Sequence, residues 1–309
     1  MDSRKIVIPG GSGFIGDSLS RHFAALGYEV IVLSRAKVGF INNVRYVLWD
    51  GRSMGEWAQY IDGAYAVINL TGRSVNCRFT KKNRKEIVES RVHSVNVLLL
   101  ACSRSVVPPL VFIQASSVGF YGNTSASCTE QSPAGADYLA RVCTMWEDAF
   151  FRHSLPSTRR AVLRFGVVLG KGGGALSRML PWARCYLGGH HGSGKQQVSW
   201  IHLKDLIRMM DFTLSGSAVE GIYNATSEHP LPNALFMAFL RHALGKPWSH
   251  PIPAFMVRLV SYLFMRTDAS VLLHGVPCFP KHFKNQGFEF KYPRLPEALH
   301  QILNSTNSM

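Results

Sequence analysis

The chain has 309 residues, 47% of them hydrophobic and 17% charged, and its formal net charge is +15. This length and composition exclude a disordered chain and allow one large domain or two joined domains. The positive charge is compatible with an anionic small molecule, nucleic acid or a membrane surface. Its densest run, residues 81–85 (KKNRK), leads into a predicted helix and has no nucleic-acid-binding signature beside it. We interpret it as a solvated helix face and expect no nucleic-acid partner.

Six cysteines are scattered along the chain, a spacing typical of neither a disulfide framework nor a zinc site. We therefore expect reduced thiols in a cytoplasmic protein. His190 and His191 have no cysteine or carboxylate cluster near them, so we expect a polar loop and no metal site. No charged-then-apolar leader opens the chain, and no apolar run reaches the roughly 18 residues of a membrane span. The closest segment, residues 252–264, is interrupted by Arg258, which predicts an amphipathic helix and no membrane partner.

Short apolar runs alternate with helical patterns through the first half of the chain. Strands are predicted at residues 6–8, 29–33, 44–48, 66–70, 110–115 and 160–164, and helices at residues 14–26, 84–103 and 138–152. Alternation of this kind is typical of parallel strand pairing. The sequence therefore predicts an α/β fold with a Rossmann-type, doubly wound parallel sheet.

The pattern changes after about residue 165, where glycines and prolines become frequent. Two further helices are predicted, at residues 233–244 and 254–263. We expect residues 1–165 to form the Rossmann domain, which some later strands rejoin. Residues 166–309 are expected to form a smaller, substrate-side α/β region.

A glycine-rich loop follows the first predicted strand and opens the first helix. It consists of Gly10, Gly11, Ser12, Gly13, Phe14, Ile15 and Gly16. In this G-x-x-G-x-x-G pattern the first glycine permits a tight turn, the second lets backbone approach a pyrophosphate, and the third lets the helix pack closely. The helix N-terminus then offers free N–H groups to the phosphates. Because the flanking strands and helix are also predicted, the loop indicates a dinucleotide site.

The end of the second strand indicates which dinucleotide is bound. NAD-binding proteins carry an acidic residue there for the ribose 2′-hydroxyl, whereas this chain has Ser34 and Arg35. A guanidinium beside a hydroxyl suits a 2′-phosphate. We therefore predict NADP(H), with a solvated loop position for Arg35 as the alternative.

Beyond these residues, the sequence resembles a known family. Asn69–Gly72 (NLTG) and Ala115–Ser117 follow the fourth and fifth strands as they do in the extended short-chain dehydrogenase/reductases. The motifs GGSGFIG, NLTG, SSVGFYG, RFGVVLGKGGGAL, GSGKQQVSWIHLKDL and FPKHFKNQGFEFKYPRLPEAL resemble an atypical, epimerase-like subgroup with an extra C-terminal segment. The resemblance runs from residue 6 to about residue 300. Two features depart from it: residues 262–270 (YLFMRTDAS) look longer than the family pattern, and Pro9 replaces the usual threonine.

The resemblance implies further cofactor contacts. Ser34 and Arg35 would hold the 2′-phosphate, and the residues implied to line the rest of the nucleotide are Leu70, Thr71, Glu86, Arg91 and Val168. For Glu86 and Arg91 the alternative is that they are helix-surface charges.

The catalytic pair of the family is incomplete in this chain. Extended members usually carry a serine and then Tyr-x-x-x-Lys, in which the lysine lowers the tyrosine pKa. None of the ten tyrosines has a lysine four residues later. Ser117 and Tyr138 occupy the serine and tyrosine positions, but the lysine position is Val142, and a phenol without a cationic neighbour keeps a pKa of about 10. Tyr121 is the other candidate proton donor.

Two functions are compatible with these residues. One is an NADP-dependent oxidoreductase or epimerase-like enzyme acting on a small substrate at the carboxyl ends of the strands. The other is a non-catalytic NADP(H)-binding sensor or partner protein. The absent lysine favours the sensor, and the retained Ser117 and Tyr138 favour the enzyme.

Overall fold

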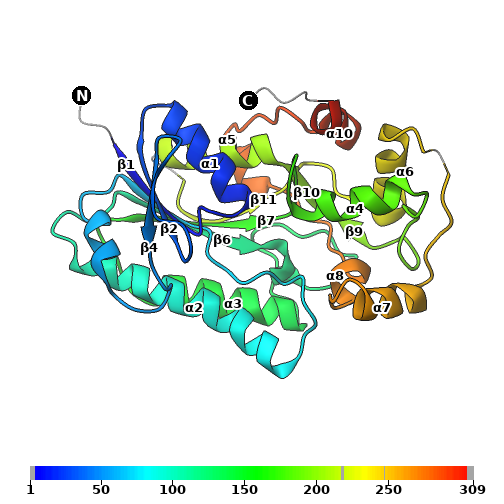
Figure 1. Cartoon of the computed structure of the whole chain (residues 1–309), viewed down its shortest axis with the longest axis horizontal. Helices are drawn as coiled ribbons and strands as arrows, with labels where there is room; N and C mark the ends of the chain where they lie inside the picture. The colour runs from blue at the N-terminus through cyan, green and yellow to red at the C-terminus, as the bar shows by residue number, and fades with distance from the viewer. Residues whose placement is uncertain (1–3, 217–218, 247, 305–309) are drawn as a thin grey trace.

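An eight-stranded sheet forms the centre of the computed structural model, which describes residues 4–216, 219–246 and 248–304. Its strands are β1 (Lys5–Pro9), β2 (Glu29–Ser34), β3 (Gly39–Ile41), β4 (Val44–Leu48), β5 (Ala66–Asn69), β6 (Val111–Ser117), β7 (Arg159–Phe165) and β11 (Gly221–Ala225). They are ordered β11–β7–β6–β5–β1–β2–β4–β3, and every pairing except that of β3 with β4 is parallel (Figure 1). The predicted Rossmann-type fold is confirmed.

Helices cover both faces of this sheet. α1 (Phe14–Ala25) and α5 (Leu203–Ser215) lie on one face, and α2 (Lys81–Arg104) and α3 (Tyr138–Phe151) lie on the other (Figure 1). Helix α1 buries Leu19 and Phe23, which are four residues apart and therefore share one side of the helix. Strand β1 is buried on both faces from Ile6 onward, as a central parallel strand requires. Short 3₁₀ helices, η1 (Glu56–Tyr60) and η2 (Val118–Tyr121), follow β4 and β6.

The strand order reverses at β1. From β1 the chain passes first to β2 on one side, and it later returns to β5 on the other side. In open α/β sheets a crevice forms at such a switch point, outside the carboxyl ends of the strands. The glycine-rich loop lies at this point, since it follows β1 directly.

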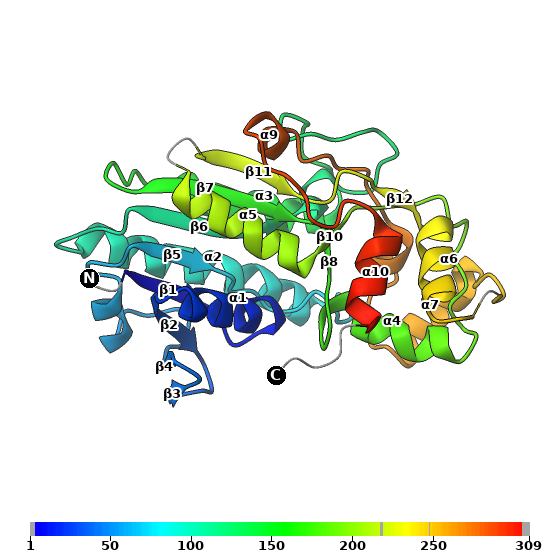
Figure 2. The same ribbon diagram turned by 90° about the horizontal axis from the view of Figure 1, so that it is seen from above.

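The second half of the chain contributes to both parts of the molecule. β11 and α5 join the large sheet, while two small sheets pair β8 (Val167–Leu169) with β10 (Trp200–His202) and β9 (Gln197–Val198) with β12 (Leu231–Pro232). The other helices are α4 (Gly174–Arg184), α6 (Asn233–Ala243), α7 (Ala254–Leu263), α8 (Ser270–Leu273), α9 (Lys281–Asn285) and α10 (Leu295–Asn304). Figure 2 shows α4, α6, α7 and α10 gathered at one end of the molecule. The division at residue 165 stays a prediction.

Five helices in this half were absent from the expected elements: α4, α5, α8, α9 and α10. Helix α4 lies in the glycine-rich stretch, because Gly173 can precede its first turn while Leu176 and Ala183 are buried on one side. Helix α5 lies where no helix was predicted, and the His202 side chain caps it by accepting from the Lys204 N–H. Its buried Asp205 accepts from the backbone N–H groups of Lys291 (3.0 Å) and Tyr292 (2.8 Å). These bonds fix the C-terminal segment to the large sheet.

Candidate functional site

The three glycines of the loop meet different steric demands. Gly10 has φ +76°, and a Cβ there would lie 2.9 Å from the carbonyl carbon of Leu70. A Cβ on Gly16 would overlap the backbone of Gly11, so α1 packs directly on the loop. A Cβ on Gly13, by contrast, would meet only the Gly10 carbonyl oxygen at 3.6 Å. Space is therefore open above Gly13, where a pyrophosphate would have to approach.

Helix α1 starts beside this space without a side-chain cap. The first N–H groups of a helix have no intrahelical acceptor, and they carry partial positive charge. Phe14 and Ile15 occupy this first turn. Glycines 170, 173 and 174 crowd the Phe14 ring, since a Cβ on any of them would come within 3 Å of it. The start of α1 can therefore accept an anion, and its Phe14 ring packs against the second half of the chain.

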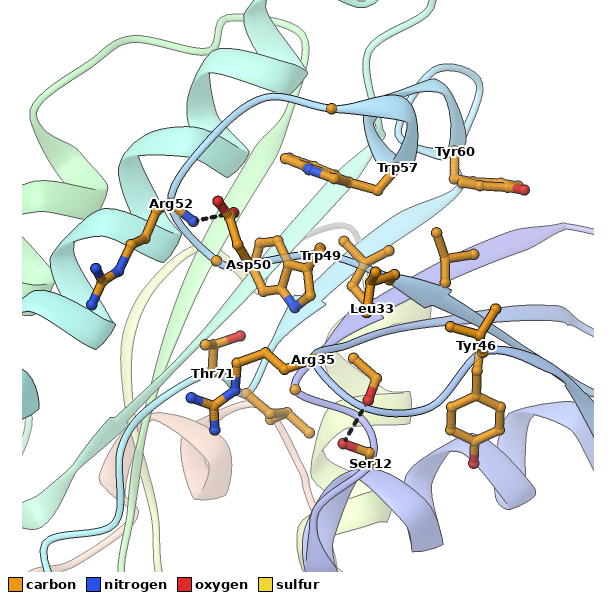
Figure 3. Close-up of a pocket in the computed structure, with 18 of the residues that line it drawn as sticks. Ser12, Leu33, Arg35, Tyr46, Trp49, Asp50, Arg52, Trp57, Tyr60 and Thr71 are labelled. Atoms are coloured by element: carbon orange, nitrogen blue, oxygen red, sulfur yellow. Dashed lines mark hydrogen bonds between the residues drawn. The ribbon is translucent and has the colours of Figure 1, made fainter.

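A cavity of about 1400 Å³ opens next to the loop (Figure 3). The close-up shows the Arg35 guanidinium reaching from the end of β2 toward Thr71, which follows β5. Ser34 donates to Ser12 Oγ (3.4 Å) and accepts from the Lys37 N–H (3.1 Å), so its hydroxyl organises the turn that carries Arg35. These predicted cofactor residues from β1, β2 and β5 therefore line one cavity.

The residues after β4 also line this cavity and were missed in the sequence. They include Trp49, Asp50, Arg52 and Trp57. Hydrogen bonds from the Ser53 hydroxyl and from backbone N–H groups lower the pKa of Asp50 to about 2. Asp50 is the second residue after a predicted strand, so the argument applied to Ser34 and Arg35 would have found it. Arg52 is another exposed cation in the same cavity.

Strand β5 ends in a polar turn that faces the cavity. The Asn69 side chain donates to Gln114 Oε1 (2.9 Å) and accepts from the Thr71 N–H (3.0 Å). Thr71 Oγ1 is buried and has no hydrogen-bond partner in the part of the chain that the structure describes. A buried hydroxyl without a partner is costly unless a ligand satisfies it. Together with the open space at Gly13, it fits a bound dinucleotide.

Glu86 and Arg91, both predicted cofactor contacts on α2, have different surroundings. The Glu86 carboxylate forms an ion pair with Arg73, which itself lines the cavity. Arg91 donates to the carbonyl oxygens of Arg73 (2.9 Å) and Ile87 (3.0 Å), and its guanidinium lies 4.9 Å from the Trp146 ring centroid. Burial lowers its pKa, although a guanidinium stays charged at neutral pH. Among the described residues it has no carboxylate partner, which leaves a half-buried cation beside the site.

Tyr138 begins α3 and lies against α2. Its hydroxyl donates to the Arg84 carbonyl oxygen (3.1 Å), and the Arg84 guanidinium lies 4.8 Å from its ring centroid. The expectation that Tyr138 lacks cationic neighbours was wrong, because Arg84 and Arg91 supply them from α2 rather than from position 142. Burial nevertheless raises the pKa of Tyr138, and the two arginines offset this only in part.

Ser117 and Val142 occupy the other two positions of the family's catalytic pattern, and Val142 lies one turn along α3 from Tyr138. Ser117 ends β6, and its hydroxyl accepts from the Gly119 N–H (3.1 Å). No hydrogen bond joins the hydroxyls of Ser117 and Tyr138 within the described residues. Val142, at the position of the family's lysine, is only 4% exposed. Cys143 beside it is fully enclosed, and burial raises the pKa of its thiol to about 12.

Tyr121 occupies a buried polar network instead of the cavity. Its hydroxyl donates to Asn224 Oδ1 (2.8 Å) and accepts from Arg164 Nη1 (2.9 Å). Arg164 also forms a two-pronged ion pair with Glu147, at 2.9 and 2.7 Å. Burial raises the pKa of Tyr121 despite Arg164. This geometry supports a structural role for Tyr121 and argues against the catalytic role considered for it.

The remaining candidate and a second cavity lie in the second half. Val168, in β8, pairs with Ile201 of β10 and is partly exposed. A cavity of about 830 Å³ lies beside the start of α2, between Arg78 and Thr80 on one side and α7 and α8 on the other. The structure describes no group of three or more potential metal ligands in residues 4–216, 219–246 and 248–304. His190 and His191 lie in the turn before β9.

The open glycine loop at the switch point and the cationic cavity beside it define a Rossmann-type dinucleotide-binding protein. A family model described as "NAD dependent epimerase/dehydratase family" matches residues 6–225, and one described as "Domain of unknown function (DUF1731)" matches residues 252–302. The chain belongs to the NAD dependent epimerase/dehydratase family. The resemblance to extended short-chain dehydrogenase/reductases with an extra C-terminal segment is thereby confirmed.

Similar proteins occur in animals, plants and bacteria. Epimerase family protein SDR39U1 of Homo sapiens is 33% identical over 97% of this chain and 99% of its own length. A chloroplastic homologue from Arabidopsis thaliana is 33% identical over 96% of this chain and 86% of its own length. A crystal structure of human SDR39U1 with NADPH aligns with a TM-score of 0.87 at 32% identity, covering 96% of this chain and 98% of that one. A nucleoside-diphosphate sugar epimerase from Corynebacterium glutamicum aligns with a TM-score of 0.76 at 26% identity, covering 98% of this chain and 58% of that one.

Proposed function

We propose that this protein binds NADP(H) in the larger cavity and acts on a small substrate held next to Tyr138, either reducing it with NADPH or epimerising it by removing and returning a hydride with NADP⁺. The observation that carries the proposal is the open space at Gly13, which lines the same cavity as Arg35. The NADPH in the human relative's crystal structure supports the choice of cofactor. Ser34, Arg35 and Thr71 would hold the adenosine side, and the first turn of α1 would hold the pyrophosphate. Bound NADPH would supply a hydride.

Tyr138 suits the role of proton donor better than that of base. Because burial raises its pKa, its hydroxyl stays protonated at neutral pH. A protonated phenol can give a proton to a developing alkoxide, which is what carbonyl reduction requires. Arg91 and Arg84 would stabilise the phenolate left behind. Ser117 would donate a second hydrogen bond to the substrate oxygen.

Calorimetry and turnover test the two parts of this proposal separately. We expect NADPH to bind at least tenfold more tightly than NADH, a difference of about 1.4 kcal/mol. With NADPH and a panel of small carbonyl compounds, Tyr138→Phe should lower turnover by about 10² to 10⁴. Tyr28→Phe, at a partly buried tyrosine outside both cavities, is the control. Full activity in Tyr138→Phe would exclude Tyr138 as the acid.

A sensor that binds NADPH without turnover is the second candidate. It is favoured by Val142, since the family's lysine position is buried and apolar here. Tight NADPH binding with no turnover of any compound by the parent protein would favour it over the enzyme. A Val142→Lys variant restores the family's Tyr-x-x-x-Lys spacing and tests whether the missing lysine limits turnover. Because Val142 is buried and an unpaired buried lysine destabilises the fold, its kinetics must be accompanied by a melting curve.

A further inference from the structure

Helix α7 exposes an apolar side to solvent. Only Val257 and Ser261 of this helix are buried. The residues exposed along it and just after it, called here the α7 face, are Phe255, Met256, Leu259, Tyr262, Leu263 and Phe264. Phe255 is 68% and Phe264 75% exposed. On an ordinary surface helix the polar side faces solvent, whereas α7 exposes its apolar side.

Other exposed apolar side chains lie at the same end of the molecule. Both views place α4, α6 and α7 together there (Figures 1 and 2). Trp182 and Leu187, at the end of α4, are exposed, as is Trp248 in the connection before α7. The two segments touch, since Ser249 Oγ donates to the Tyr186 carbonyl oxygen (2.6 Å). Exposed apolar residues gathered at one end of a molecule are typical of an interaction site.

This end of the molecule is also rich in cations and poor in acids. No aspartate or glutamate lies between Glu228 and Asp268, a stretch that contains Arg241, Lys246, Arg258 and Arg266. None lies between Asp148 and Asp205 either, a stretch that includes the whole of α4. In the described ranges, Arg184, Arg258 and Arg266 are exposed and form no ion pair. The surface therefore complements a partner that is both anionic and apolar.

These properties select among possible occupants. A symmetric contact with a second copy would bring the same arginines face to face, and like charges repel. A bilayer of anionic lipids offers negative headgroups around an apolar interior, which matches arginines around aromatic and aliphatic side chains. None of the helices in the described parts of the chain is long and apolar enough to cross a bilayer, and the ten residues of α7 span only about 15 Å.

We propose that the α7 face docks on the surface of an anionic lipid bilayer, with α7 lying in the plane of the headgroups. The contact is peripheral and departs from the expectation of no membrane partner, which was based on the lack of a sufficiently long apolar run. Phe264 and Arg266 belong to the stretch that looks longer than the family pattern. Arg258 and Tyr262 also line the 830 Å³ cavity, so docking would bring the mouth of that cavity to the lipid surface.

Vesicle flotation tests the proposal with the full chain. We expect the protein to float with phosphatidylcholine vesicles that contain phosphatidylglycerol, and not with pure phosphatidylcholine. Raising salt from about 0.1 M to about 0.5 M should release it, since screening weakens surface attraction. Phe255→Ser/Leu259→Ser/Leu263→Ser should lower partitioning at least about tenfold. Arg184→Gln and Arg258→Gln should each lower it about fivefold.

Matched variants elsewhere on the surface provide the control. Arg104→Gln/Val106→Ser changes one exposed cation and one exposed apolar residue near the end of α2, and it should float like the parent. No flotation of the parent with anionic vesicles at low salt would overturn the proposal, as would equal flotation of parent and arginine variants. A parent dimer that the triple serine variant converts to a monomer, measured by light scattering, would assign the face to a second copy instead. The arginine variants keep the test decisive if the triple variant does not fold.

Discussion

The two halves of the large sheet are built differently. On the side of β1, β2 and β4, the buried residues are almost all apolar, and the site is formed by backbone at the glycine loop. On the side of β6, β7 and β11, Ser116, Arg164 and Asn224 point into a buried polar network with Glu147 and Tyr121. The first half offers an open space and backbone N–H groups, whereas the second fixes its geometry through paired side chains.

This difference explains where the family's catalytic pattern has changed. The cation beside Tyr138 comes from α2, so the position four residues along α3 is free to be apolar. The network behind Ser117 holds β6, α3 and β7 in place without the missing lysine. We infer that stability in the polar half depends on each buried charge keeping a partner, whereas in the glycine half binding depends on the absence of side chains.

The largest expected effect is on the polar half. Glu147→Gln leaves the Arg164 guanidinium buried at 2% exposure without its carboxylate, which should cost about 3–5 kcal/mol of unfolding free energy. Urea unfolding followed by circular dichroism measures this. The control is Arg21→Gln in the exposed pair with Asp17 on α1, which should cost less than about 0.5 kcal/mol. Similar costs for the two variants would mean that the buried pair is not what holds this half together.

The glycine half should lose binding rather than stability. Gly13→Val fills the open space, and we expect NADPH affinity to fall at least about a hundredfold, or about 2.7 kcal/mol. The melting temperature should change by only a few degrees, because a Cβ at this position meets only the Gly10 carbonyl oxygen, at 3.6 Å. Gly16→Ala should do the opposite and destabilise the fold, since its Cβ overlaps Gly11. Normal NADPH affinity in a folded Gly13→Val protein would place the cofactor elsewhere.

The same contrast decides how much the sequence could predict. The glycine loop and the strands around it were predicted because each depends on neighbours within about 30 residues. Helix α7 was predicted to the residue, whereas the pairing of Arg91 and Arg84 with Tyr138 joins positions about 50 residues apart. The Tyr121–Asn224 bond spans 103 residues. No local pattern encodes such contacts, since they depend on how β6, β7 and β11 align in the sheet.

A pH effect of intermediate size should arise where the C-terminal segment meets α5. His202 is 2% exposed, its Nε2 lies 2.8 Å from Gln301 Oε1, and burial lowers its pKa to about 4. Its pKa in the unfolded chain is about 6.5, so the unfolded state binds more protons between these values. The free energy of unfolding is therefore highest above pH 6.5 and falls as the pH drops toward 4. At pH 5 the loss is about 2 kcal/mol.

Unfolding of His202→Gln at pH 7.5 and pH 5 isolates this group. The variant has no imidazole to protonate, so its loss of stability between the two pH values should be about 2 kcal/mol smaller than that of the parent. An identical pH dependence in parent and variant would show that His202 does not titrate in this window.

The smallest expected effect concerns cofactor choice within the glycine half. Three exposed arginines, Arg35, Arg45 and Arg52, line the same cavity, and only Arg35 follows the strand end where the 2′-hydroxyl of a ribose is read. Arg35→Ala should weaken NADPH about tenfold, or about 1.4 kcal/mol, and leave NADH nearly unchanged, because only NADPH carries the phosphate. Arg52→Ala is the matched control and should preserve the ratio of the two affinities. If Arg52→Ala abolishes the preference and Arg35→Ala does not, the phosphate is bound by the loop after β4, the region that the sequence argument overlooked. Calorimetry with both cofactors on the parent and the two variants distinguishes these assignments. The ratio of NADPH to NADH affinity is compared for each protein, because a change in cavity shape that affects both cofactors equally leaves this ratio unchanged.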